Sequence, residues 1–434
     1  MNHRLKKTLH AVALGVLLLT RATHAETLEQ AWQVALGADR ALQAARSEVS
    51  AADEDLAAAK SRRLPAVTAG VGINRFNEAP AFDFSAAGVP ATLPLFGDES
   101  MEMANANVTL PLYTGGSVRH GIDAADAMRA AQVSKSDATE QQVKLAVARH
   151  YIDVLRAQRA LDVAISSVRG LSAHMKDVED MFEAGAVARN DYLSAAVSLA
   201  DAEQRRLQGA NALDLARAAY NRALGRELGA PVDLDESLPG LDSRLETDSL
   251  ADLSAAARSN RRELDGLGAA ADAFRAEARA VRGRTLPQLA LTGGYYSLEN
   301  DFLNRDDFWM VGVGVQWNLF DGGQARRKAG ALQHRATALS QQRADLESMI
   351  ELEVRQAWLR LNETRERRRL AERAVEQAEE NLRVVRDRYR NGEGTNTEVL
   401  DAETLRSLSR SNYDNADFDA SLALYELARG VGQL

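Results

Sequence analysis

Three carboxylates lie shortly after glycines that interrupt long helical patterns, and clustered carboxylates can attract cations. Asp191 lies six residues after Gly185, and Glu398 lies six residues after Gly392. Asp401 follows Glu398 by three residues, so the two side chains share one face of a helix. Several copies of this face around a narrow opening would concentrate negative potential and attract cations.

A local role is the alternative for two of these carboxylates. Asp191 and Glu398 would suit the first turn of a helix, where an acidic side chain stabilises the helix dipole. Asn190 and Thr397 would then be the N-caps, since both are residue types favoured there. Asp401 lies one turn further along, where the dipole explains it less well.

Few other residues have the types or the spacing that catalysis requires. The histidines beyond the amino terminus are dispersed, at His120, His150, His174 and His334, and match no metal site. The chain has no cysteine, no phosphate-binding loop and no G-x-S-x-G motif. Its 53 basic and 62 acidic residues give a net charge of −9, which disfavours nucleic-acid binding. We therefore expect no enzymatic activity, no cofactor, no metal and no nucleic-acid partner.

Residues 1–25 have the pattern of a signal peptide. Arg4, Lys6 and Lys7 precede a short apolar stretch, and small residues at the end predict cleavage after Ala25. A buried amino-terminal helix is the alternative. No later segment has the roughly 18 consecutive apolar residues of a membrane-spanning helix. We therefore expect an exported protein.

The prolines mark where long helices end, because proline inside a helix costs about 3 kcal/mol. All eight lie within residues 65–111, 231–239 and at 287. Between them, apolar residues recur with helical spacing. The predicted helices cover residues 27–63, 117–182, 191–227, 249–284, 324–389 and 398–429. The two longest would each extend about 100 Å, far beyond a typical globular helix.

The second half of the chain repeats the first. Residues 112–116, ending in Gly115-Gly116, recur 207 residues later and end in Gly322-Gly323. A coiled-coil seam, with apolar residues alternately four and three apart, recurs with the same offset. Its members are Ala164, Val168, Leu171, Met175, Val178 and Phe182, then Ala371, Val375, Ala378, Leu382, Val385 and Tyr389. We predict two repeats, residues 26–229 and 249–434, joined by a linker at 230–248; unrelated amphipathic helices are the alternative.

Four short segments alternate apolar residues with small or polar ones, the period of a β-strand. One pair lies within residues 64–113 and a second within 286–320, and an insertion at 79–98 is predicted to be a loop. Each segment has about ten residues, as transmembrane strands do. Tyr295, Trp309 and Trp317 are placed like the interface aromatics of an outer-membrane barrel. A soluble hairpin packed on helices is the alternative, although no matching apolar partner is evident.

Four strands are too few to close a barrel, since the smallest single-chain barrels have about eight. An open sheet in lipid would leave edge groups without hydrogen bonds. Three copies would provide twelve strands, although closure alone leaves two or four copies open. The predicted fold is mainly α: long antiparallel coiled-coil helices form an α-barrel, and four strands per protomer form a membrane β-barrel portion.

The order of these segments resembles the TolC family of outer-membrane efflux factors over essentially the whole mature chain. The most specific matches are residues 28–32, the two Leu-aromatic-x-Gly-Gly junctions, residues 388–392 and residues 397–402. The resemblance implies a homotrimer in the outer membrane, with a twelve-stranded barrel and a large periplasmic α-barrel. It also implies the exit duct of a tripartite pump or type I secretion machine, working with a periplasmic adaptor and an inner-membrane transporter.

The resemblance assigns roles to the two helical turns. Ala184-Gly185-Ala186 and Asn391-Gly392-Glu393 match the positions that dock the adaptor, although the second departs from the family's apolar flanks. Helix capping by glycine is the alternative for both.

The resemblance also implies a gate near these turns. Asp191, Glu398 and Asp401 match its acidic entrance, and Tyr389 matches an aromatic residue of its closing network. The network's basic partner position holds Gly394 here, so one closing bond is expected to be missing or supplied elsewhere.

Two other functions compete with a passive conduit. A trimeric coiled-coil adhesin or stalk would explain the heptads but not the doubled strand pairs. A periplasmic enzyme on a helical scaffold would need a nucleophile and base that the sequence does not offer. The residues do not identify the cargo, so drugs, metal ions, siderophores and polypeptides all remain open.

Overall fold

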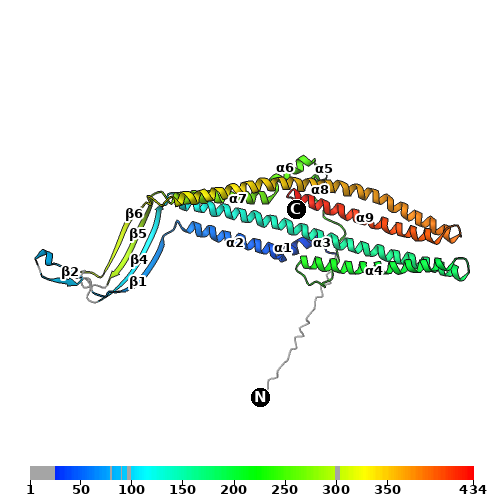
Figure 1. Cartoon of the computed structure of the whole chain (residues 1–434), viewed down its shortest axis with the longest axis horizontal. Helices are drawn as coiled ribbons and strands as arrows, with labels where there is room; N and C mark the ends of the chain where they lie inside the picture. The colour runs from blue at the N-terminus through cyan, green and yellow to red at the C-terminus, as the bar shows by residue number, and fades with distance from the viewer. Residues whose placement is uncertain (1–24, 79–80, 89, 95–98, 299–303) are drawn as a thin grey trace, which may run out of the picture.

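Two helices of 67 residues span the helical body. The computed structural model describes residues 25–78, 81–88, 90–94, 99–298 and 304–434; the predicted signal peptide, apart from Ala25, lies outside the described residues. α3 (Ser117–Glu183) and α8 (Gln324–Arg390) run from a β-sheet at one end to two helical turns at the other (Figure 1). Both match the predicted helices 117–182 and 324–389 to within one residue. Among the described residues, no helix has both the length and the apolar character needed to cross a lipid bilayer.

The remaining helices complete a curved wall that is one layer thick. They are α1 (Leu28–Ala38), α2 (Arg40–Ser61), α4 (Arg189–Ala223), α5 (Arg244–Thr247), α6 (Leu250–Asn260), α7 (Arg262–Gly283) and α9 (Asn396–Gly430). Near the sheet the neighbours are, in order, α2, α3, α7 and α8. Near the turns the order is α4, α3, α9 and α8, so α9 lies between the two long helices. A single layer leaves much of each helix uncovered.

The helices predicted at 27–63 and 249–284 are each divided in two by a single residue. Asp39 and Arg261 have extended backbones, with ψ angles of 122° and 109°, and separate α1 from α2 and α6 from α7. The Asp39 carboxylate caps α2 by accepting a backbone N–H at 2.8 Å. The buried Arg261 guanidinium donates to Glu263, Glu353 and the carbonyl oxygen of Gly430. Each break is stabilised by polar contacts that helical periodicity does not reveal.

The β-sheet has four antiparallel strands. They are β1 (Ala66–Arg75), β4 (Ser100–Tyr113), β5 (Gln288–Leu298) and β6 (Asp307–Gln316), in that spatial order. One hairpin from each repeat therefore contributes, and the two join through β4 and β5. Among the described residues, the outer edges of β1 and β6 pair with no further strand. This arrangement is the sheet that the alternating segments predicted.

One face of the sheet is apolar and uncovered. The register places Val67, Val108, Leu291 and Val313 on this face, and it pairs Tyr295 directly with Trp309. Val71 is 89% exposed and Trp309 is 76% exposed. The opposite face carries mostly small or polar residues, with Gly70, Asn105, Thr292 and Gly312 among them. Among the described residues no other element covers this apolar face, whereas the soluble-hairpin alternative would require such a partner.

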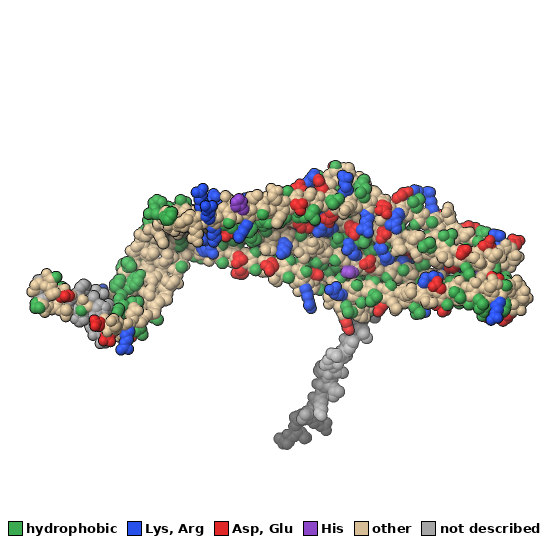
Figure 2. Space-filling model, in the orientation of Figure 1, with side chains coloured by type: hydrophobic (Ala, Val, Ile, Leu, Met, Phe, Trp, Pro, Cys, Tyr) green, Lys and Arg blue, Asp and Glu red, His purple; other side chains and the backbone are tan. Residues whose placement is uncertain are grey.

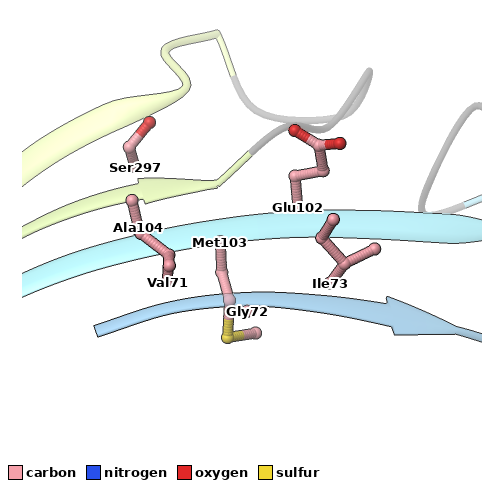
Figure 3. A pocket seen from close by; sticks show the side chains of 7 residues that line it. All are labelled: Val71, Gly72, Ile73, Glu102, Met103, Ala104 and Ser297. Atoms are coloured by element: carbon pink, nitrogen blue, oxygen red, sulfur yellow. The ribbon is translucent and has the colours of Figure 1, made fainter.

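Both ends of the apolar face are polar or aromatic. At the end far from the helices, Glu102 and Ser297 lie on the same side as Val71, whereas Met103 points to the other side (Figure 3). At the helical end, the indole N–H of Trp317 donates to the Thr285 carbonyl at 3.1 Å.

A register shift in β4 changes one predicted position. The expected alternation would have continued from Leu110 to Leu112, but a bulge between Pro111 and Tyr113 brings Tyr113 opposite Leu289. An extra residue in one strand moves every following side chain to the other face. Both Leu112 and Tyr113 are consequently exposed at the helical end of the sheet.

The elements of the two halves recur with constant offsets. α3 and α8, and likewise α4 and α9, begin and end 207 residues apart. α1 and α6, and likewise α2 and α7, begin and end 222 residues apart. The extra length of the first half lies between β1 and β4. There the segment predicted to be a loop contains a short pair of strands, β2 (Ala81–Asp83) and β3 (Thr92–Pro94), and a 3₁₀ turn at Ser85–Ala87.

The largest core lies midway along the helical body. Tyr151, Tyr220 and Tyr425 are fully buried there with leucines of α1 and α4. The Tyr151 hydroxyl lies 2.7 Å from the carbonyl oxygen of Glu26 and 2.6 Å from that of Asp235. These contacts attach the amino-terminal segment and residues 230–248 to α3. The core therefore holds the wall together at its middle and leaves both ends to lighter packing.

Candidate functional site

The two helical turns at the far end of the body are glycine-capped and exposed. Gly185 and Gly392 have φ angles of +74° and +76°, the left-handed conformation that glycine adopts readily. In each turn the residue after glycine donates its N–H back across the last helical turn, at 2.8 Å, as in a Schellman motif. The six predicted docking residues, Ala184, Gly185, Ala186, Asn391, Gly392 and Glu393, are all exposed. Capping thus accounts for the glycines, and the surface of both turns stays accessible.

The helices after the turns begin two residues earlier than predicted. Asn190 and Thr397 are therefore not caps, because α4 starts after Ala188 and α9 starts after Thr395. Glu398 completes a capping box in which its carboxylate accepts the Thr395 N–H at 2.9 Å. Helix capping consequently explains Glu398 in part.

Asp401 has a different environment. It is exposed one turn further along α9, and no hydrogen bond or ion pair of its side chain occurs within the described residues. Asp191 lies in the first turn of α4, as the helix-dipole alternative expected. Of the three carboxylates, Asp401 alone has no structural role evident in this part of the chain.

Tyr389 belongs to a buried contact between the two repeats. Its ring meets the His174 ring edge-on, with centroids 5.1 Å apart. His174 is 4% exposed, and its Nε2 donates to Asn396 Oδ1 at 2.7 Å. Asn396 Nδ2 in turn donates to the backbone carbonyl of Asp191 at 3.0 Å. We call His174, Tyr389 and Asn396 the tip latch, because they connect α3, α8 and α9 and reach α4 through Asp191.

The surroundings of Gly394 are tight for the basic side chain that the resemblance would place there. A Cβ at this position would lie 3.2 Å from both the Tyr389 nitrogen and the Glu398 carboxylate. Other arginines link the repeats instead. Arg390 lies 3.1 Å from Asp177 and joins α8 to α3. Arg386 donates to the Gly170 carbonyl at 3.3 Å, also across this contact.

A buried carboxylate pairs with Arg386 and with a second arginine, Arg406. Glu403 on α9 is 2% exposed and pairs with Arg386 at 3.1 Å and with Arg406 at 2.5 Å. Gly170 on α3 approaches the pair so closely that an added Cβ would lie 3.1 Å from a Glu403 oxygen. Sequence patterns did not single out Glu403 or Asn396. In the sequence each looks like an ordinary helical residue, because contacts with other helices do not show there.

The tip latch should weaken in acid. Burial is the main cause that lowers the His174 pKa, with Arg386 and Arg390 acting the same way and Asn396 and Asp177 opposing them. Because the folded-state pKa is depressed, the unfolded chain binds the proton more readily. The contact should therefore be stable above the ordinary histidine pKa of about 6.5 and lose stability as the pH falls below it.

Hydrogen exchange in α9 between pH 7.5 and 5.5 measures this loss, after correction for the intrinsic exchange rate. In the His174→Gln variant the pH dependence should flatten. His120→Gln, at the opposite end of α3, should behave as the unmodified protein does. An equal pH dependence in the His174 variant would contradict the role of this histidine.

Comparison with known proteins agrees with this architecture. The family profile described as "Outer membrane efflux protein" matches residues 31–226 and 253–433. The chain is 25% identical to the outer membrane protein TolC of Vibrio cholerae over 434 residues, covering 98% of this chain and 94% of that protein. It is also 25% identical over 302 residues to the alkaline protease secretion protein AprF of Pseudomonas aeruginosa, covering 66% and 61%.

A solved structure has the same fold. The outer-membrane channel OprN superimposes with a TM-score of 0.79 at 19% identity, covering 94% of this chain and 90% of that one. The helical wall, the exposed apolar sheet and the profile match lead to one assignment. The chain belongs to the outer membrane efflux protein family and is an outer-membrane channel component, not an enzyme.

Proposed function

We propose that three copies of this chain form a passive duct through the outer membrane and the periplasm. The observation that carries the proposal is the exposed apolar face of a four-stranded sheet whose edges, β1 and β6, have no further partner among the described residues. Three sheets joined edge to edge would satisfy the backbone at those edges, as lipid requires. The apolar face would then contact lipid and the polar face would line the lumen.

The helical wall would continue this barrel into the periplasm. α3 and α8 each have 67 residues, which corresponds to about 100 Å. Three walls of four helices would enclose a second cylinder, with the turns at its far mouth. A conduit of this kind conducts passively, so the energy for transport would come from an inner-membrane transporter.

The exposed turns are suited to contact a periplasmic adaptor. Ala184-Gly185-Ala186 is small and apolar, whereas Asn391-Gly392-Glu393 is polar, so the two turns would present different surfaces to that partner. Similarity to TolC and to a protease secretion protein supports a tripartite pump or a type I secretion system as the setting.

Single-channel recording in planar lipid bilayers tests the conduit. The purified full-length protein should give discrete, nucleotide-independent conductance steps. A coiled-coil adhesin or stalk would give no steps, and that outcome would refute the duct.

The same recordings test the acidic mouth. The double variant Glu398→Gln/Asp401→Asn removes both charges, while glutamine can still complete the capping box. Its cation preference should fall about threefold or more, because the ring of carboxylates no longer concentrates negative potential at the opening. Glu376→Gln, which removes one exposed carboxylate of α8 about four helical turns before Arg390, provides a control for charge. Unchanged reversal potentials in the double variant would exclude these carboxylates from the mouth.

A further inference from the structure

The segments that connect the sheet to the helices are strongly basic. Residues 62–65, 112–120, 282–287 and 317–328 contain eight Arg or Lys residues and one acidic residue, Asp321, a local charge of +7 in a chain whose net charge is −9. We call the eight basic residues the junction collar. They are Arg62, Arg63, Arg119, Arg282, Arg284, Arg326, Arg327 and Lys328.

The collar is free of internal charge compensation. All eight side chains are exposed, and none makes an ion pair with another residue in the part of the chain that the structure describes. Asp321, the carboxylate within these segments, accepts two backbone N–H groups of the α8 amino terminus, each at 2.8 Å. Unneutralised charge of this density favours an external anionic partner.

Both repeats contribute to the collar at equivalent positions. Arg62 and Arg284 are 222 residues apart, the offset of α2 and α7. Arg119 and Arg326 are 207 residues apart, the offset of α3 and α8. α2 and α7 each precede a strand pair, and α3 and α8 each follow one. Basic residues therefore occur before and after the strand pair in both repeats. Three copies would therefore surround the barrel with a complete ring.

The collar lies directly beyond the apolar face. Trp309 and Trp317 are eight residues apart, about 27 Å along a strand, which is comparable with the apolar band of about 25 Å in outer-membrane barrels. Trp317 is at the helical end, where Leu319 and Phe320 are also exposed. Figure 2 shows Lys and Arg side chains gathered where the helical body meets the sheet, beside hydrophobic side chains. This position corresponds to the level of lipid headgroups.

A groove where β4 is followed by α3 is lined by both basic and apolar side chains. Its volume is about 490 Å³, and Arg62, Arg63 and Arg119 line it together with Leu112, Tyr113 and Val118. The three guanidinium groups could hold a phosphate, and the apolar residues could contact the adjoining part of an acyl chain. A soluble anion would use only the first of these features.

We propose that the junction collar binds the anionic headgroups of phospholipids in the leaflet that faces the helical body. This inference rests on the proposed function, because it requires the sheet to be inserted in a membrane. The arginines would fix the depth of the barrel by pairing with lipid phosphate, while Trp317 and Phe320 lie in the adjoining apolar layer.

Spin-labelled lipids test the collar in the full-length protein. The protein is reconstituted in phosphatidylcholine vesicles, and the fraction of motionally restricted label is compared for phosphatidylglycerol and phosphatidylcholine probes. The expected preference for phosphatidylglycerol is about fivefold, decreasing at high salt. In the quadruple variant Arg62→Gln/Arg119→Gln/Arg284→Gln/Arg326→Gln it should fall below about twofold.

A matched variant controls for total charge. Arg169, Arg222, Arg355 and Arg373 are exposed arginines of the helical body without ion pairs within the described residues. Replacing these four by glutamine should leave the lipid preference unchanged. An equal loss in both variants would overturn the collar.

Two further outcomes distinguish the collar from the duct. No preference in the unmodified protein, with single-channel conductance intact, would overturn the collar alone. The collar alone would also be overturned if the quadruple variant kept the lipid preference and changed only ion selectivity, because the arginines would then face the lumen. Absence of any restricted lipid would overturn the membrane-inserted barrel and the collar with it.

Discussion

Replacing Gly115 by alanine is expected to prevent stable folding of the junction between sheet and helices. Gly115 has a φ angle of +59°, and a Cβ there would collide with the carbonyl oxygen of Gly283 and lie 2.7 Å from the Leu286 side chain. Gly283 is equally constrained, since its own Cβ would lie 2.6 Å from the Gly115 oxygen. Backbone atoms cannot move aside as a flexible side chain can. The loss should therefore exceed about 3 kcal/mol.

The amount of folded protein in the outer-membrane fraction and its thermal unfolding midpoint measure this effect. Gly116→Ala is the matched control, because Gly116 has a φ angle of +82° but its Cβ would contact only the His120 side chain, at 3.4 Å. It should cost about 1–2 kcal/mol, the penalty of the left-handed conformation alone. Equal losses in the two variants would show that backbone conformation, and not the contact between the repeats, sets the requirement for glycine.

Replacing Glu403 by alanine is expected to destabilise the contact between the repeats near the turns by about 3 kcal/mol. The substitution leaves Arg386 and Arg406 without their shared carboxylate in a largely buried position. Arg386 is 32% exposed and can partly rehydrate, which places the expected loss at the low end for a broken buried ion pair. Its bond to the Gly170 carbonyl should weaken as well, so the proposed mouth should open more often in single-channel recordings.

Hydrogen exchange in α8 and α9 and the mean open time provide the two measurements. Glu403→Gln should have a smaller effect, because the amide oxygen can still accept one hydrogen bond. Glu376→Ala removes an exposed carboxylate without an ion pair within the described residues and should change neither quantity. If the Glu403→Ala variant matched Glu376→Ala, the buried ion pairs would not stabilise the contact between the repeats.

Local patterns predicted most of the elements but not their interruptions. α8 was expected at 324–389 and spans Gln324–Arg390, because apolar periodicity extends over its whole length. The breaks at Asp39 and Arg261 were missed because both residues lie inside a helical pattern. The bulge before Tyr113 was missed for a related reason, since strand alternation does not show where an extra residue is accommodated.

The candidate site could be located from the sequence but not assembled. Gly185 and Gly392 indicated both turns, because a glycine at a helix end has a local conformational reason. Tyr389, Asp191 and Glu398 were placed near those turns correctly. The contacts between the repeats could not be predicted, because their members are far apart in the sequence: His174 is 222 residues from Asn396, and Arg386 is 216 residues from Gly170.

The sequence by itself determined the class of fold, the repeat and the family resemblance, because periodicity, glycine and proline act within a few residues of the backbone. Only the tertiary structure decided which polar groups meet. The tip latch, the bond from Arg386 to the Gly170 carbonyl and the contact of Gly115 with Gly283 each join helices or turns that are distant in the chain. Such contacts depend on how four helices slide against one another in the wall. A shift of one turn would preserve every local pattern and separate every one of these pairs.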